Sequence, residues 1–275
     1  MLFASCAGRQ VRRPNLARVG LKSWVCVYNE KSSPADIGKF DLAVLDADAH
    51  PDLMDLRQSD TILLGYVSLC EVGAYRWYWP EIATKSWVLA ENPAWGSIML
   101  DVRSREWQTL LLQRVLPGIL SAGFGGFFLD TVDTAEYLEK YHSGQKYPGA
   151  LRAVTALIKA IRARFPQALV VMNRGYAVLN EVAGDLDGVV AESLFTAVDE
   201  HDRLRLREQS ESDPEVLRLK HAREKSHLVV LTLDYFDTEL EPEIGAIVAR
   251  ARTHGFVPYV STRSLDRVYF FTLKE

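Results

Sequence analysis

Short apolar runs that end on a polar residue recur along the chain, and they constrain its fold more than any other feature. In Gly126–Asp130, small and apolar residues lead directly into an aspartate. A parallel strand buried on both faces has this pattern where it leaves the core. The candidate strands are Trp24–Tyr28, Leu42–Asp46, Ile62–Leu69, Ser97–Asp101, Gly126–Asp130, Leu169–Asn173, Gly188–Glu192, Leu228–Asp234 and Phe256–Val260.

Amphipathic segments lie between several of these runs. Ser104–Ser121, Gly149–Phe165 and Glu241–His254 carry apolar residues at helical spacing, and Gly255 follows the last of them as a helix stop. Repeated units of a strand followed by a helix predict an α/β protein with a (β/α)8 TIM barrel.

Nine strand candidates compete for eight places, so the pattern contains one strand in excess. The weakest candidate is Ser97–Asp101, which is short and follows a long irregular segment. Without it, Asp130 ends the fourth barrel strand and Glu192 the sixth. With it, they end the fifth and the seventh, and the sequence leaves both assignments open.

The length of 275 residues suits one barrel domain. We expect residues 1–22, which are polar and arginine-rich beyond the first few positions, to form a flexible lead-in, and residues 23–275 to form a single domain. Arg203–Lys225 is heavily charged and contains Pro214, which indicates a solvated loop and helix.

Composition excludes several classes of protein. Apolar residues make up 48% of the chain and charged residues 25%, which indicates a globular protein with a large core. A net charge of −4 gives no reason to expect a nucleic-acid partner, and no apolar run is long enough to span a membrane.

Leu2–Cys6 is similar to the end of a lipoprotein signal, but the apolar segment that should precede it is missing, so we identify no complete signal peptide. We expect the chain to act as a monomer.

Polar side chains gather where the strands end. Because the carboxyl ends of barrel strands share one face, these residues should converge on a single site. They are Tyr28, Asn29, Asp46, Ser68, Glu71, Asp130, Asp133, Asn173, Arg174, Glu192, Ser193, Asp234, Tyr235 and Tyr259.

The predicted site is rich in carboxylates and poor in histidine. Two carboxylates, with Tyr and Asn nearby, are the usual equipment for cleaving a glycosidic bond: one stabilises or traps the sugar cation and the other protonates the leaving oxygen. Asp130 and Glu192 are the candidates. The alternative is that both are helix caps or ion-pair partners.

Aromatic residues provide the second signal. Tyr75–Trp79, Trp87 and Trp95 fall in the long segment after the third strand. Sugar faces stack on exposed aromatic rings, and amino sugars add a cation–π interaction. The other interpretation is that this segment packs a small core of its own.

Asp46, Asp48 and His50 are candidate metal ligands, since two carboxylates and an imidazole suit zinc or manganese. No second histidine lies at ligand spacing, and the cysteines Cys6, Cys26 and Cys70 have neither metal-ligand nor disulfide spacing. We therefore expect no metal and no cofactor.

Several segments together match a known pattern: Val27–Tyr28, Leu42–Asp46, Tyr66–Glu71, Tyr75–Trp79, Gly123–Asp133 and Asp187–Ser193. From about Trp24 to Tyr259 the chain resembles glycoside hydrolase family 114, the endo-α-1,4-polygalactosaminidase-like barrels. Cys70 stands where the family has glycine and Gly125 where it has aspartate, so the substrate-binding details can differ here.

The resemblance implies a glycosidase that cleaves α-linked, galactosamine-containing polysaccharide, at an extracellular or cell-envelope location. Asp130 would be the nucleophile and Glu192 the acid/base of a retaining mechanism, for which Glu192 needs a raised pKa. The expected substrate-binding residues are Tyr28, Asp46, Tyr66, Ser68, Glu71, Tyr75, Arg76, Asp133, Asn173, Asp234, Tyr235 and Tyr259.

Two other functions remain open from the sequence. One is a metal-dependent carbohydrate deacetylase that uses Asp46, Asp48 and His50. The other is a non-catalytic polysaccharide-binding barrel whose aromatic residues bind the glycan.

Overall fold

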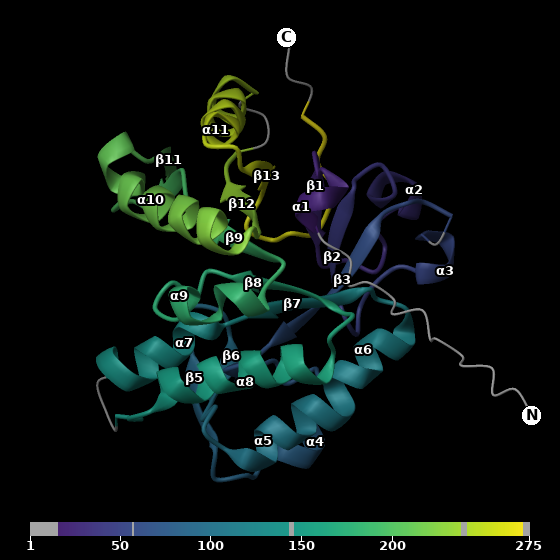
Figure 1. The fold of residues 1–275 in the computed structure, drawn as a ribbon, viewed down its shortest axis with the longest axis vertical. Coiled ribbons are helices and arrows are strands. Elements are labelled where there is room, and N and C mark those ends of the chain that lie inside the picture. Colours follow the sequence, from purple (N-terminus) through teal and green to yellow (C-terminus); the bar gives the residue numbers. More distant parts are fainter. Residues whose placement is uncertain (1–15, 57, 143–145, 238–240, 272–275) are drawn as a thin grey trace, which may run out of the picture.

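The computed structural model describes residues 16–56, 58–142, 146–237 and 241–271 and confirms the α/β barrel (Figure 1). Eight parallel strands form one sheet in the order β1-β2-β3-β7-β8-β9-β12-β13. Their bounds are Trp24–Val27, Leu42–Asp46, Ile62–Ser68, Gly126–Asp130, Leu169–Asn173, Gly188–Glu192, Val229–Tyr235 and Val257–Ser261.

The surplus strand lies outside the barrel. β6 (Ser97–Leu100) pairs antiparallel with β4 (Glu71–Val72) and β5 (Val88–Asn92) in a separate sheet. Its first two residues are half exposed, whereas β2 and β8 are buried throughout. Asp130 therefore ends the fourth barrel strand and Glu192 the sixth.

The barrel is nearly closed, and one side-chain and one backbone hydrogen bond complete its seam. β1 and β13 are the two ends of the sheet order. The Trp24 indole Nε1 donates to the Val257 carbonyl at 3.0 Å, and the Tyr28 amide donates to the Leu265 carbonyl at 2.7 Å. The last strand is thereby held against the first.

Helices lie around the outside of the strands (Figure 1). The predicted helix at 104–121 is continuous but contains a π-helical turn, and those at 149–165 and 241–254 are each confirmed as one helix. The helical segments are α1 (Leu16–Val19), α2 (Pro34–Ile37), α3 (Leu53–Leu56), α4 (Trp79–Ile82), α5 (Arg105–Leu110), η1 (Leu111–Val115), α6 (Leu116–Ala122), α7 (Val132–Glu136), η2 (Tyr137–Tyr141), α8 (Ala150–Arg164), α9 (Leu179–Val182), η3 (Ala183–Asp185), α10 (Gln209–Ser226) and α11 (Glu241–Thr253). A hairpin of β10 (Thr196–Val198) and β11 (Leu204–Leu206) precedes α10.

The charged segment 203–225 contains β11 and most of α10, close to the expected loop and helix. Leu2–Cys6 and most of the predicted lead-in lie outside the described residues. Within the described part of the lead-in, Leu16 on α1 is buried beside Gly188, so this end of the segment is packed against the barrel. In the described parts of the chain, no helix combines the length and the apolar character needed to cross a membrane.

Gly126 provides a test of strand packing. A Cβ atom at this position would lie 2.1 Å from the Leu169 carbonyl oxygen on β8, and that oxygen is backbone, so it cannot swing away. Gly126→Ala should lower the free energy of unfolding by about 3 kcal/mol, measured by urea denaturation. Gly245→Ala, in α11 with open space around it, should raise that free energy by about 0.5–1 kcal/mol. Equal effects of the two substitutions would contradict this packing.

Candidate active site

A cleft of about 1250 Å³ opens at the carboxyl ends of the barrel strands. Asp130, Asn173 and Glu192 are the last residues of β7, β8 and β9, which are neighbours in the sheet, and all three line the cleft. Most of the other predicted site residues also line it: Tyr28, Asp46, Tyr66, Ser68, Glu71, Tyr75, Arg76, Asp133 and Tyr235.

One chain of hydrogen bonds connects the two candidate catalytic carboxylates. Asp130 accepts from the Tyr66 hydroxyl at 2.8 Å and from Asn173 Nδ2 at 2.9 Å. Glu192 accepts from the same Asn173 nitrogen at 2.6 Å and from the Tyr235 hydroxyl at 2.8 Å. Each carboxylate thus has one tyrosine of its own and shares the asparagine with the other.

The shared nitrogen limits the distance between the carboxylates. Asn173 Nδ2 lies 2.9 Å from Asp130 Oδ1 and 2.6 Å from Glu192 Oε2, so these two oxygens are at most 5.5 Å apart, the sum of those distances. Carboxyl groups about 5–5.5 Å apart are typical of retaining glycosidases, whereas inverting enzymes have about 6.5–9.5 Å.

The surroundings of Glu192 favour its protonated form. Burial raises its pKa, and the negative charge of Asp130 raises it further. The hydrogen bonds from Asn173 and Tyr235 act in the opposite direction because they stabilise the ionised form. The raised pKa expected from the sequence is confirmed, with burial as its main cause.

The backbone turns sharply after each of these three strand ends. Thr131, Arg174 and Ser193 have φ values of 58°, 51° and 52°, the left-handed region that residues other than glycine seldom occupy. Hydrogen bonds hold these turns: the Arg174 amide donates to the Val190 carbonyl at 2.9 Å, and the Ser193 amide to the Leu233 carbonyl at 2.8 Å. Strain of this kind costs about 1–2 kcal/mol for each residue and is concentrated at functional sites.

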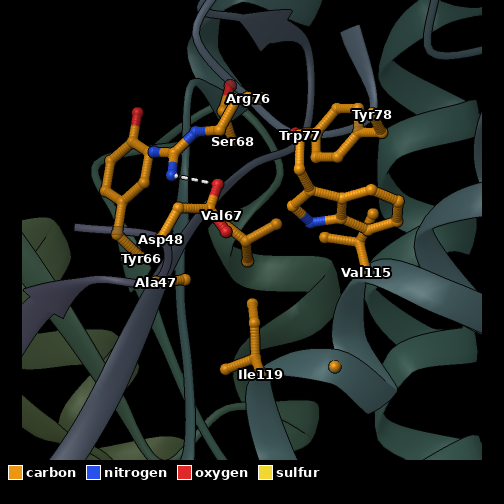
Figure 2. Close-up of a pocket in the computed structure, with 11 residues that line it drawn as sticks. Ala47, Asp48, Tyr66, Val67, Ser68, Arg76, Trp77, Tyr78, Val115 and Ile119 are labelled. Atoms are coloured by element: carbon orange, nitrogen blue, oxygen red, sulfur yellow. Dashed lines mark hydrogen bonds and ion pairs between the residues drawn. The ribbon is translucent and has the colours of Figure 1, made fainter. Parts of the chain in front are cut away.

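Arg76 is buried between two aspartates. It donates to both Asp46 oxygens at 2.8 Å and to Asp48 at 2.9 Å, and its guanidinium stacks on the rings of Tyr66 and Tyr75. Figure 2 shows Arg76 beside the Tyr66 ring with its ion pair to Asp48. Arg76 therefore fixes the tyrosine that donates to Asp130.

The residues proposed for a metal site do not fit that role. Asp46 and Asp48 are bound to a guanidinium, and the His50 ring makes its hydrogen bond to the Pro51 carbonyl and packs edge-on against Phe124. Among the described residues, no group of three or more His, Cys, Asp or Glu side chains has the geometry of a metal site.

Glu71 joins three separate elements at the wall of the cleft. Its carboxylate accepts hydrogen bonds from Asn92 on β5 at 3.1 Å, from Ser97 on β6, and from Thr134 on α7 at 2.6 Å. The Glu71 amide donates to Ser68 Oγ at 3.1 Å. The small antiparallel sheet is thereby attached to the helix that follows Asp130.

Asp133 is paired with Arg174 at 3.1 Å. Burial raises the pKa of Asp133, Arg174 lowers it, and the nearby charge of Asp130 raises it. Both residues line the cleft, Asp133 three residues beyond the end of β7 and Arg174 directly after the end of β8.

Asp234 does not line the cleft, which disagrees with its predicted role in substrate binding. Its fully buried carboxylate accepts from the amides of Phe195 and Thr196 at 2.7 and 3.1 Å. Side chains alternate along a strand, so Tyr235 faces the cleft and its neighbour Asp234 faces away. Asp234 instead holds the turn that follows Glu192.

Tyr259 is also outside the cleft lining. It is buried against Trp24 and Phe40 at the barrel seam, and its hydroxyl accepts from the Tyr269 amide at 3.1 Å. Its position fits closure of the barrel better than the predicted contact with substrate.

The aromatic segment divides between the two interpretations. Trp87 is buried and packs on Trp107, as expected of a small core. Tyr75 and Trp95 line the cleft and remain 70% and 60% exposed, as expected of surfaces that stack on sugars. Tyr137 on η2, outside the predicted segment, also lines the cleft and is 43% exposed.

Some cleft residues were not selected from the sequence. Asn92, Ser97 and Thr134 surround Glu71, while Arg263 approaches the Trp95 ring from the loop after β13. Thr134 lies beyond the end of β7, Asn92 and Ser97 belong to β5 and β6 of the small antiparallel sheet, and Arg263 lies in the loop after β13. None of them ends a barrel strand, so the strand-end pattern did not indicate them. Arg174, in contrast, is one of the polar strand-end residues that the sequence indicated.

Comparison with known proteins shows that the chain is similar to glycoside hydrolases. The model of glycoside-hydrolase family GH114 matches residues 6–275. The glycoside hydrolase domain of PelA from Pseudomonas aeruginosa superposes with a TM-score of 0.77 at 27% identity, over 90% of this chain and 97% of that one.

Two further relatives are more distant. Ega3 of Aspergillus fumigatus, solved as a complex with galactosamine, has a TM-score of 0.69 at 14% identity over 93% of this chain and 95% of that one, which shows a shared fold. An uncharacterized protein of Thermotoga maritima is 22% identical over 86% of this chain and 80% of its own length. From the family match over nearly its whole length, the chain belongs to glycoside-hydrolase family GH114.

Proposed function

We propose that this glycoside hydrolase cleaves α-linked, galactosamine-containing polysaccharide by a retaining mechanism, with Asp130 as nucleophile and Glu192 as acid/base. The observation that carries the proposal is the Asn173 amide, which donates to both carboxylates. It brings Asp130 Oδ1 and Glu192 Oε2 within 5.5 Å of each other, the sum of its two hydrogen-bond distances. Membership of family GH114 and the galactosamine bound to the structural relative Ega3 support this substrate class.

In the first step, Asp130 attacks the anomeric carbon while the bond to the leaving oxygen breaks. Glu192 gives its proton to that oxygen, so the bond from carbon to Asp130 replaces the glycosidic bond. In the second step, water attacks the same carbon, Glu192 takes a proton from the water, and Asp130 leaves.

The hydrogen-bond partners of Asp130 and Glu192 suit these two chemical steps. Tyr66 and Asn173 donate to Asp130, which keeps the carboxylate oriented toward the cleft. Burial raises the pKa of Glu192, so it can hold the proton that it must deliver. When Asp130 becomes esterified its charge disappears, which lowers the pKa of Glu192 for its second role as a base.

The cleft favours a cationic sugar. Carboxylates outnumber arginines among the described residues that line it. Moreover, Arg76 and Arg174 are neutralised in ion pairs with aspartates. An unacetylated galactosamine carries an ammonium group, which the remaining negative charge attracts.

Loss of either carboxylate tests the assignment. Asp130→Asn and Glu192→Gln should each lower kcat on galactosamine polymer by at least about 10³-fold, because each removes a group that takes part in both steps. Release of reducing ends measures the rate, and circular dichroism checks the fold. Glu181→Gln, an exposed carboxylate outside the cleft, is the control and should keep its activity. Full activity of both catalytic variants would show the assignment to be wrong.

The pH dependence of stability tests the environment of Glu192. Its pKa is raised in the folded chain, so the folded state binds the proton more tightly than the unfolded state. Ionisation therefore costs stability as the pH rises through the folded pKa, and below about pH 4, near the ordinary glutamate value, this cost is absent.

The quantity to measure is the melting temperature of Glu192→Gln minus that of the unsubstituted protein at the same pH. We expect this difference to increase from pH 4 to pH 8. The changed hydrogen bond to Asn173 adds a constant offset, so the informative quantity is the change with pH. A relative melting temperature that stays flat across this range would contradict the raised pKa.

A further inference from the structure

Thr131, the residue directly after Asp130, has a backbone conformation that is costly for its residue type. Its φ is 58°, in the left-handed region that a β-branched side chain enters only against steric repulsion. It also immediately precedes α7, a position where a threonine hydroxyl commonly accepts from the first turn of the helix. Within the described part of the chain, its side chain makes no such bond. Helix capping therefore does not account for a threonine at this position.

The Thr131 hydroxyl instead holds the end of β7 to the end of the neighbouring strand β3. Thr131 Oγ1 accepts from the Cys70 amide at 3.0 Å and shares a hydrogen bond with Ser68 Oγ at 2.7 Å. Beside it, the Leu69 amide donates to the Asp130 carbonyl at 3.0 Å. These bonds attach the strand end that carries Asp130 to its neighbour on the side away from β8.

The segment after β3 is itself held by further hydrogen bonds. The fully buried Trp107 indole on α5 donates from Nε1 to the Leu69 carbonyl at 2.8 Å. The Glu71 amide donates to Ser68 Oγ at 3.1 Å. The support that the Thr131 hydroxyl contacts is therefore fixed from two directions.

The position of the Asp130 carboxylate depends on this support. Asp130 and Thr131 share a peptide group, so a rotation of the Thr131 backbone moves the end of β7. The carboxylate accepts from Tyr66 at 2.8 Å and from Asn173 at 2.9 Å, a geometry that weakens with small displacements. A misplacement of about 1 Å at a reacting group can cost about 100-fold in rate.

We propose that Thr131 is a positioning residue for the Asp130 nucleophile. Its hydroxyl holds the end of β7 against β3 in the left-handed turn that directs the carboxylate at the anomeric carbon. The inference rests on the proposed function, because it takes Asp130 as the attacking group. Ser68, which the sequence analysis gave as substrate-binding, acts here as the partner of Thr131.

Thr131→Val removes the hydroxyl and keeps the β-branched shape, so it tests the hydrogen bonds alone. On galactosamine polymer it should lower kcat by about 10- to 100-fold and leave KM within about threefold, because the lost contacts act on the reacting geometry and not on binding. Thr131→Ser keeps the hydroxyl and should stay within about threefold of the unsubstituted kcat. Release of reducing ends measures both constants, and circular dichroism checks the fold.

Thr61→Val is the matched control, directly before the first residue of β3 and so at the end of the strand away from the cleft. The Thr61 hydroxyl donates to the Phe40 carbonyl at 2.8 Å, so the substitution removes a comparable hydrogen bond. This variant should keep its kcat. Unchanged kcat in Thr131→Val, an increase in its KM alone, or an equal loss of kcat in Thr61→Val would overturn the proposal.

A substrate with a dinitrophenolate leaving group identifies the carboxylate through which Thr131 acts. This group departs without a proton, so a defect in Glu192 is bypassed whereas a defect in Asp130 remains. On a dinitrophenyl galactosamine oligomer, the loss of kcat/KM in Thr131→Val should persist, while the loss in Glu192→Gln should shrink by at least about tenfold. If the loss in Thr131→Val shrinks in the same way, Thr131 does not act through Asp130.

Failure of the proposed function can be distinguished from failure of this inference. If the unsubstituted enzyme hydrolyses no galactosamine polymer, the proposed function fails, and crystal structures of the unsubstituted protein and Thr131→Val then judge Thr131. The variant should lose the hydrogen bond to Asp130 from Tyr66 or from Asn173. A carboxylate that keeps both bonds in the variant overturns the positioning role.

A second variant decides if Thr131→Val does not fold. Ser68→Ala removes one of the two partners of the Thr131 hydroxyl and leaves the Cys70 amide as the other. It should lower kcat on galactosamine polymer by at least about threefold with KM unchanged. An unchanged kcat, or a raised KM alone, would make Ser68 a substrate contact or a neutral residue and would overturn the proposal.

Discussion

The Asn173 amide donates to two carboxylates at once, and the rest of the site is arranged around this interaction. Two anions at this distance repel each other strongly in a partly buried cleft. The shared donor offsets part of that repulsion and fixes the geometry, while Tyr66 and Tyr235 hold the outer oxygens. The amide must present its nitrogen to both, since its oxygen would repel them. The same repulsion helps to raise the pKa of Glu192.

The barrel supplies the spacing that this interaction needs. β7, β8 and β9 are adjacent, so their last residues stand side by side, with the asparagine between the two acids. A left-handed residue after each strand turns the chain away and leaves the side chain in the cleft. Arg76 and Glu71 support the site from the wall, the first by fixing Tyr66 and the second by joining the small sheet to α7.

Sequence patterns predicted the barrel and the strand ends because burial on both faces imposes a simple rule on residue type. They could not decide whether Ser97–Asp101 belonged to the barrel, since a short apolar run looks alike in either sheet. They misplaced Asp234, because strand alternation shows which of two neighbours faces the cleft only once the register is known. The left-handed turns at Thr131, Arg174 and Ser193 had no glycine to mark them.

The account depends on a covalent step at Asp130, and the anomeric form of the first product tests it most directly. Proton NMR of galactosamine oligomer hydrolysis, recorded before the sugar ends equilibrate, shows which anomer is released. Two successive displacements at one carbon restore the α configuration, so the account predicts α product first. Initial release of the β anomer would mean one displacement by water, and Asp130 would then not be the nucleophile.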